Sequence, residues 1–216
     1  MLAGSIAALT AACGDRAGFR MARLGYNMLF GDAVPNPLSR AQVEAFPYAM
    51  LEVRLGKTVV ADLVLVRRVG ADLQWQSQDR KVIETRSGRL VKTSGLPTDI
   101  VRTEFLDEDP VARGLQGLTG ATEIKRIVDF SQKGKYGRVV ESRLEVVGDD
   151  PITILELTYP TRLVRESNRI EAERWEFENL FWFDPSTGVV WRSEQHVGPD
   201  FPPLRISLLK PPAANV

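Results

Sequence analysis

The stretch that decides the fold is RVVESRLEVV, residues 138–147, in which apolar and charged residues alternate. In an extended chain, successive side chains point to opposite faces. Val140, Leu144 and Val146 therefore share one face, and the charged residues between them share the other. This period of two predicts a half-buried β-strand, which ends at the turn residues Gly148-Asp149-Asp150-Pro151.

Similar short segments follow one another along the chain from Tyr48 onward. Gly56-Lys57 and Ser87-Gly88 are compact turn signals, and Pro185–Gly188 places Pro and Gly where turns favour them. Many strands at short spacing predict an all-β fold: a single antiparallel domain over 48–216, built as a barrel-like or strongly curved sheet. The predicted strands are 48–55, 58–66, 72–77, 81–86, 89–93, 122–131, 138–147, 152–159, 162–175, 180–184, 189–197 and 204–209.

Residues 1–13 read MLAGSIAALTAAC and carry no charge. This apolar stretch is shorter than the roughly 20 residues that a membrane-spanning helix needs. It is typical of a secretory signal peptide, and Thr10-Ala11-Ala12-Cys13 resembles a bacterial lipobox, although Thr10 stands where Leu is usual. That resemblance implies that Cys13 is lipidated. The alternative is a short N-terminal helix in which Cys13 is a small apolar residue.

Residues 14–47 are predicted to be a tether that leads into the β-domain. Apolar residues at loose helical spacing predict a short amphipathic helix over about 17–30. Pro35-Asn36-Pro37 ends that pattern, and Ser39 is placed to cap a one-turn helix through Val43.

The composition argues against several classes of function. Lys+Arg and Asp+Glu are both 28, so the chain lacks the basic excess of a nucleic-acid-binding protein. With one Cys and one His, neither a disulfide within the chain nor a typical zinc site is expected. The acidic run Asp107-Glu108-Asp109 lacks the ligand spacing of an EF-hand and is expected to be a solvated turn beside a short helix within 107–116. We expect no metal and no cofactor.

The tryptophans are the most informative candidates for binding. They lie on predicted strands, where an indole either fills the core or stacks on a sugar ring, with Arg or Gln bonding to hydroxyl or acidic groups. Counting outward from the Pro185–Gly188 turn predicts that Trp182 opposes Trp191 across the last hairpin. The candidate ligand or partner patch comprises Trp75, Arg89, Trp182, Trp191, Arg192 and Gln195.

Several spaced motifs resemble the YjbF/GfcB family of bacterial lipoproteins. They are Leu29-Phe-Gly31, Phe46-Pro-Tyr-Ala49, Trp75-Gln-Ser-Gln-Asp79, Gly88-Arg-Leu-Val-Lys-Thr-Ser-Gly-Leu96, Asn179-Leu-Phe-Trp-Phe-Asp184 and Arg192-Ser-Glu-Gln195. The resemblance implies an outer-membrane lipoprotein with a barrel-like fold, linked to group 4 capsule or exopolysaccharide export. It also implies partners, namely a β-barrel outer-membrane protein and a soluble periplasmic protein. It supplies no catalytic residue, and only lipidation carries over, onto Cys13.

We therefore expect a non-catalytic export accessory, anchored in the outer membrane, that binds partner proteins or glycan. The alternatives are a periplasmic enzyme that processes glycan or lipid, and a lipid-carrying chaperone. Clustered carboxylates with perturbed pKa in a groove would favour the enzyme. A deep apolar pocket would favour the carrier, and a shallow exposed patch would favour partner binding.

Overall fold

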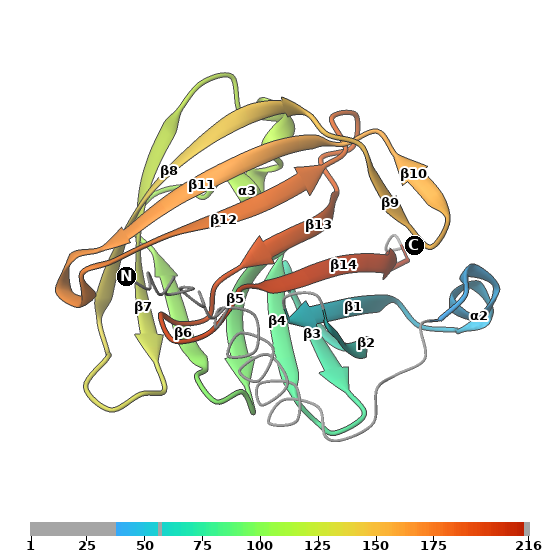
Figure 1. The fold of residues 1–216 in the computed structure, drawn as a ribbon, viewed down its shortest axis with the longest axis horizontal. Coiled ribbons are helices and arrows are strands. Elements are labelled where there is room, and N and C mark those ends of the chain that lie inside the picture. The colour runs from blue at the N-terminus through green and yellow to red at the C-terminus, as the bar shows by residue number, and fades with distance from the viewer. Residues whose placement is uncertain (1–37, 56–57, 214–216) are drawn as a thin grey trace, which may run out of the picture.

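A computed structural model describes residues 38–55 and 58–213, and the side chains of 58–60 are not described. Twelve antiparallel strands form one curved sheet in the order β5-β4-β3-β2-β1-β14-β13-β12-β11-β8-β7-β6, and β9 and β10 form a separate hairpin (Figure 1). This confirms the predicted all-β, barrel-like architecture. The strands are β1 Met50–Leu55, β2 Thr58–Val69, β3 Asp72–Ser77, β4 Val82–Arg86, β5 Arg89–Ser94, β6 Ile100–Phe105, β7 Thr122–Phe130, β8 Arg138–Asp149, β9 Ile152–Ile154, β10 Leu157–Tyr159, β11 Arg162–Ile170, β12 Trp175–Phe183, β13 Val190–Gln195 and β14 Leu204–Lys210; the helices are α2 Arg40–Ala45 and α3 Pro110–Arg113, with 3₁₀ turns η1 Leu115–Gly117 and η2 Glu171–Glu173.

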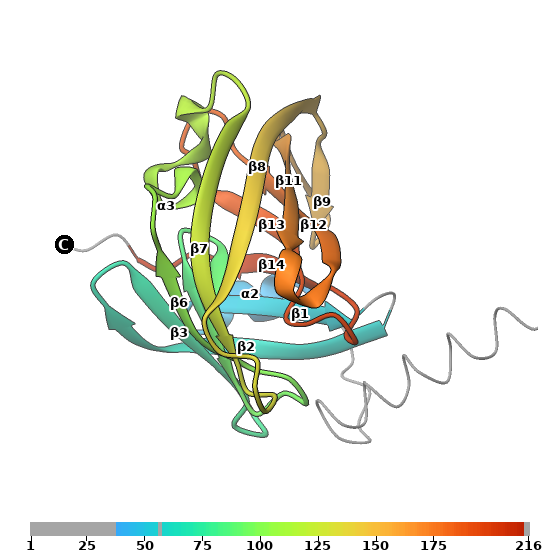
Figure 2. The ribbon, with the colours of Figure 1, turned by 90° about the vertical axis from the view of Figure 1, so that its left-hand side faces the viewer.

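The two outermost strands of the sheet, β5 and β6, lie next to each other and nearly close the barrel. Side-chain hydroxyls join them. Thr103 Oγ1 donates to the Val91 carbonyl at 2.8 Å, and the Ile100 amide donates to Thr93 Oγ1 at 2.9 Å. Figure 2 shows β7, β8 and β11 running along the wall of this barrel, with α3 beside one end.

The period of two in β8 sets which side chains face the interior. Val140, Ser142 and Leu144 are buried, whereas the alternate positions Glu141 and Arg143 are exposed. Two apolar clusters fill the barrel, one around Trp75 and Val53 and the other around Phe181 and Leu144. The alternation in residues 138–147 thus predicted the strand and its buried face correctly.

A third apolar cluster lies outside the sheet, under α2 and the β9–β10 hairpin. It contains Val43 of α2, Ile152 and Ile154 of β9, and Trp182. Ser39 caps α2 in a reciprocal capping box, as the sequence predicts. Arg40 Nη2 then donates to the Ile154 carbonyl at 2.8 Å, which holds α2 on the hairpin.

Two of the predicted strands are wrong in extent, and one strand is missing from the prediction. Segment 152–159 is two short strands, because Leu155 and Glu156 adopt positive φ angles of 45° and 68° and make a turn. Segment 162–175 breaks at η2, where Arg174 has a φ of 49°, so β11 and β12 are separate strands of one hairpin. The sequence reading also missed β6, a closing strand with mostly exposed or half-exposed side chains after Ile100.

The prediction that Trp182 opposes Trp191 is wrong. The turn is as expected, since the Asp184 amide donates to the Val189 carbonyl at 2.9 Å. A register shift then pairs Phe183 with Val190 and Trp182 with Arg192, which leaves Trp191 as the extra residue of a β-bulge. The ring of Trp191 instead packs on Tyr159, with centroids 4.2 Å apart.

Cys13 and the helix predicted over 17–30 lie outside the described residues, as does the Gly56-Lys57 turn. No helix within the described residues is long and apolar enough to cross a membrane.

Candidate functional site

A buried ion network lies inside the barrel, where it joins strands β5, β7 and β11 to the start of α3. Arg89 at the start of β5 makes a bidentate pair with Asp109, at 2.8 and 2.9 Å, and reaches Glu166 of β11 at 2.8 Å. Arg126 of β7 lies 3.2 Å from the same Glu166 carboxylate. All four charged side chains are at most 7% exposed, and their formal charges cancel.

Neutral side chains complete the hydrogen bonding of this network. Asn179 Nδ2 donates to Glu166 at 2.7 Å. Arg126 Nη1 donates to Ser142 Oγ at 2.6 Å, and its Nη2 donates to Asn168 Oδ1 at 3.1 Å. Because a buried charge is costly unless it is paired and hydrogen-bonded, these partners are what allow the ions to remain inside.

The electrostatics of Glu166 follow from its two cationic neighbours. Burial alone would raise its pKa, but Arg126 and Arg89 outweigh burial and lower the pKa from 4.5 to about 2. For Arg89, burial acts to lower the pKa, and Glu166 and Asp109 together reverse that and raise it. Glu166 and Arg89 are therefore held in their ionised forms at neutral pH, which suits a structural role rather than proton transfer.

Asp109 corrects one expectation. The acidic run 107–109 was expected to be a solvated turn, yet Asp109 is 4% exposed. Its carboxylate accepts from the Val111 amide at 3.1 Å, and so caps α3, while it pairs with Arg89. Only Asp107 and Glu108 of the run are exposed. The short helix predicted within 107–116 is present.

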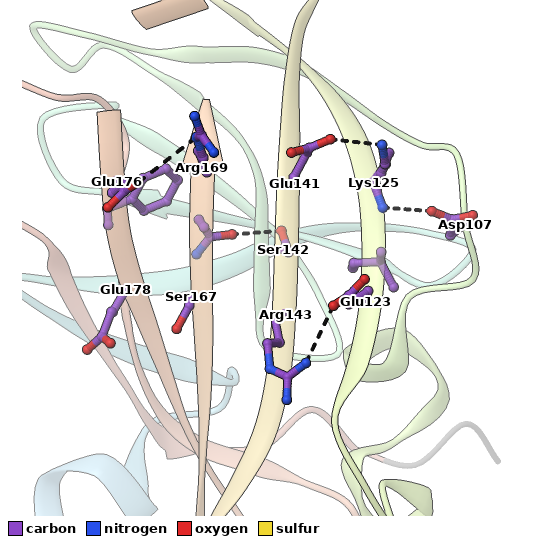
Figure 3. A pocket seen from close by; sticks show the side chains of 13 residues that line it. Asp107, Glu123, Lys125, Glu141, Ser142, Arg143, Ser167, Arg169, Glu176 and Glu178 are labelled. Atoms are coloured by element: carbon purple, nitrogen blue, oxygen red, sulfur yellow. Dashed lines mark hydrogen bonds and ion pairs between the residues drawn. The ribbon is translucent and has the colours of Figure 1, made fainter. Parts of the chain in front are cut away.

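An open groove of about 680 Å³ runs across the outer face of β7, β8, β11 and β12. Figure 3 shows its charged side chains in two rows. The strand register sets both rows: one is Lys125, Glu141, Arg169 and Glu176, and the other is Glu123, Arg143, Ser167 and Glu178.

The charges in the groove are paired across the strands. Lys125 Nζ lies 2.8 Å from Glu141, and Arg143 lies 3.4 Å from Glu123. These side chains are more than half exposed, so each pair adds little to stability and remains open to exchange for a ligand's charges. The Lys125 pair lowers the pKa of Glu141.

Ser142 connects the groove with the interior. It lines the groove between the two rows (Figure 3), and its hydroxyl also accepts from Arg126. Asn168 lines the groove in the same way and likewise binds Arg126. The ion network therefore bonds directly to two residues that line the groove, a link that spacing along the sequence does not reveal.

The six residues of the predicted patch lie on two sides of the sheet. Trp75, Arg89 and Gln195 are each at most 2% exposed and point into the barrel. Gln195 Oε1, for example, accepts from the Leu90 amide at 2.9 Å, across the interior. The structure thus does not bring these three together with the other members of the patch, which lie outside.

The outer three members of the patch do lie near one another, beneath β9 and β10. Trp182 Nε1 donates to Asp150 Oδ2 at 2.7 Å, and Trp191 packs in the same apolar cluster. Arg192 Nη2 donates to the Thr153 carbonyl at 2.9 Å, which fastens the hairpin. Any binding of ligand or partner by these residues stays a prediction.

Among the carboxyl groups that the structure describes, that of Asp62 has a clearly raised pKa. It lies on the outer face of β2, opposite Glu52 of β1 and outside the groove. Burial, and then repulsion from Glu52, raise its pKa from 3.8 to about 6, although Arg54 opposes the shift. A folded state that binds the proton more tightly than the unfolded chain loses stability as the pH rises from 3.8 to about 6.

Asp62→Asn is therefore expected to stabilise the protein at pH 7. The gain in unfolding free energy should be about 1 kcal/mol or less, because the side chain is only partly buried and solvent screens its charge. Urea denaturation at pH 4 and pH 7 measures the effect, which should vanish at pH 4. Asp200→Asn, in an exposed loop, is the control. Equal effects of the two substitutions at both pH values would contradict the expectation.

Comparison with known proteins places the chain among bacterial lipoproteins. The family described as "Group 4 capsule polysaccharide lipoprotein gfcB, YjbF" matches residues 26–209. The chain is 25% identical over 170 residues to the uncharacterized lipoprotein GfcB of Escherichia coli K12, covering 79% of each chain. It is 25% identical over 173 residues to the uncharacterized lipoprotein YjbF of the same organism, covering 80% of each.

A solved structure shares the fold. The crystal structure of the hypothetical lipoprotein YmcC from Escherichia coli K12 superposes with a TM-score of 0.74 at 23% identity. The match covers 83% of this chain and 92% of that one.

Proposed function

This chain belongs to the group 4 capsule polysaccharide lipoprotein family, and from that premise we propose that it is a non-catalytic accessory in capsule or exopolysaccharide export. It is anchored by lipid at the periplasmic face of the outer membrane and acts by binding. Its ligands are partner proteins of the export assembly, among them an outer-membrane β-barrel and a periplasmic protein, or the glycan itself.

The observation that carries this proposal is the charged groove on β7, β8, β11 and β12. Its exposed acids and bases lie on four strands that the buried ion network joins through hydrogen bonds and ion pairs. Such a surface matches a polar partner, because complementary charges set specificity and orientation. A rigid surface also loses little conformational entropy when a partner binds.

The state of the carboxyl groups favours binding over turnover. Hydrolysis of a glycosidic bond uses one carboxyl group with a raised pKa beside a second carboxylate. In the groove, Glu123, Glu141 and Glu176 each lie within 4.0 Å of a Lys or Arg nitrogen. Asp62, whose pKa is raised, lies outside the groove.

Tethering makes a weak interface sufficient. If Cys13 carries the lipid, residues 14–37 reach at most about 86 Å when fully extended. The domain would then explore a limited volume at the membrane, which raises its effective concentration toward a membrane-bound partner.

Deleting the gene is expected to reduce surface or secreted polysaccharide. Incubating the polymer with purified protein is expected to leave its chain length unchanged, as size-exclusion chromatography would measure. A purified protein that shortened or modified the glycan, and lost that activity through one acidic substitution, would replace this proposal with the enzyme alternative.

Complementation tests the groove itself. The double variant Arg143→Glu, Arg169→Glu makes both rows predominantly acidic and is expected to leave polysaccharide export near the level of the deletion strain. Both arginines are 55% exposed, so the fold should tolerate the change. Arg102→Glu is the matched control, because Arg102 is 60% exposed on β6 and does not line the groove. Full complementation by the double variant would exclude the groove as the binding surface.

A further inference from the structure

A second pocket, of about 490 Å³, opens at one end of the barrel. That volume falls within the range of about 300–1,000 Å³ that is typical of small-ligand sites. Its walls are mainly apolar and include Leu51, Leu73 and Ile206 from the inner face of the sheet, with Trp75 at its floor. The pocket is separate from the groove, since the two share no lining residue.

The polar groups deep in this pocket already have partners. The indole N–H of Trp75 donates to Thr85 Oγ1 at 2.9 Å. Ser193 Oγ accepts from Gln195 Nε2 at 2.8 Å. A sugar would bring several hydroxyl groups that need hydrogen bonds, whereas a hydrocarbon chain needs none. The interior of this pocket therefore suits a hydrocarbon chain.

The rim of the pocket is built by close contacts at glycines. A Cβ atom on Gly88 would lie 2.6 Å from the Cβ of Val190, and one on Gly188 would overlap the side chain of Gln116. These three turns, from β4–β5, η1 and β12–β13, converge at the opening. At Gly88 the β4–β5 turn therefore lies too close to Val190 for a side chain, whereas the Gln116 side chain at Gly188 is free to move.

The pocket opens near the point where the N-terminal segment joins the barrel. Lys210 Nζ, at the end of β14, donates to the Glu44 carbonyl of α2 at 3.0 Å. Pro211, the next residue, lines the pocket. Figure 1 shows α2 and the end of β14 on the same side of the barrel. A lipid anchor at the N-terminus would therefore be attached to the same side of the barrel as this pocket.

We propose that this pocket binds one acyl chain of a membrane lipid. The apolar walls take up the hydrocarbon, and the opening leaves the polar headgroup at the rim. This inference goes beyond the proposed role of the groove and does not depend on it, because a different surface and a different ligand are involved.

The probe is cis-parinaric acid, a fatty acid whose fluorescence rises when its chain enters an apolar site. Titration into the purified full chain should give saturable binding with one site per molecule. Leu73→Glu places a carboxylate in the apolar wall and is expected to weaken binding at least about tenfold. Leu208→Trp reduces the free volume and tests the same pocket without adding charge.

Leu157→Glu is the matched control, because Leu157 is 49% exposed on β10 and is absent from the pocket lining. It should bind the probe like the unmodified protein, and thermal denaturation checks that each variant is folded. The proposal would be overturned if the unmodified protein bound the probe without saturation, or if the folded pocket variants bound it with equal affinity. Displacement of the probe by a soluble oligogalacturonate would also overturn it. Loss of acyl binding without loss of polysaccharide export would leave the groove proposal unaffected.

Discussion

Replacing Glu166 by glutamine is expected to lower the free energy of unfolding by about 3–5 kcal/mol. The substitution preserves the shape of the side chain but removes the charge that faces both Arg89 and Arg126. Arg89 keeps its pair with Asp109, whereas Arg126 loses its one ion-pair partner among the described residues. A buried cation without a counter-charge is the reason for the large effect.

Urea denaturation at pH 7 measures this loss, and acid supplies a second readout. Because the pKa of Glu166 is lowered from 4.5 to about 2, its stabilisation is complete above pH 4.5 and disappears as the pH falls toward 2. That part of the pH dependence should be absent from Glu166→Gln.

The control for Glu166 is Glu123→Gln, whose carboxylate is 77% exposed and lies 3.4 Å from Arg143. An exposed pair of this kind contributes about 0–1 kcal/mol. If the two substitutions lowered the unfolding free energy equally, the buried network would not have the role assigned to it.

Cys13→Ser is expected to move the protein from the membrane fraction to the soluble fraction and to abolish complementation of a deletion strain. Membrane attachment through several acyl chains is stable, whereas attachment through one chain is marginal, so loss of the acylated residue should leave almost no protein bound. Membrane fractionation and mass spectrometry of the mature N-terminus measure the change.

Thr10→Leu is the matched control for Cys13→Ser, since it restores the usual lipobox residue beside an intact Cys13. It should be lipidated at least as fully as the unmodified protein. A Cys13→Ser protein that stayed in the membrane and supported export would show that the anchor lies elsewhere. An unmodified Cys13 in mature protein that still carries Met1 would have the same meaning.

Local patterns in the sequence were enough to determine the all-β class and most of the strands. Alternation in residues 138–147 identified the buried face of β8, and the Ser39 signal identified the start of α2. These features depend on residues within a few positions of one another. Secondary-structure propensity, helix capping and side-chain alternation all depend on such neighbouring residues. They can therefore be predicted from the sequence.

The boundaries that failed depend on backbone conformation at single positions. Nothing in the residue types of Leu155, Glu156 or Arg174 favours a positive φ, yet each adopts one where a strand turns back. The bulge at Trp191 likewise shifts the register by one residue. At each of these positions the folded chain turns or bulges where the residue pattern favours extended backbone.

The sites were decided almost entirely by the tertiary structure. The sequence singled out Arg89 and the acidic run at 107–109, but gave no sign that they meet each other and Glu166, 77 residues from Arg89. The groove likewise needs the register of β7, β8, β11 and β12.

The sequence by itself determined the class of fold and indicated membership of a lipoprotein family, and it predicts an anchor at Cys13. The tertiary structure decided which charges are buried, which are exposed and where a pocket opens, because burial and pairing depend on residues that only the folded chain brings together.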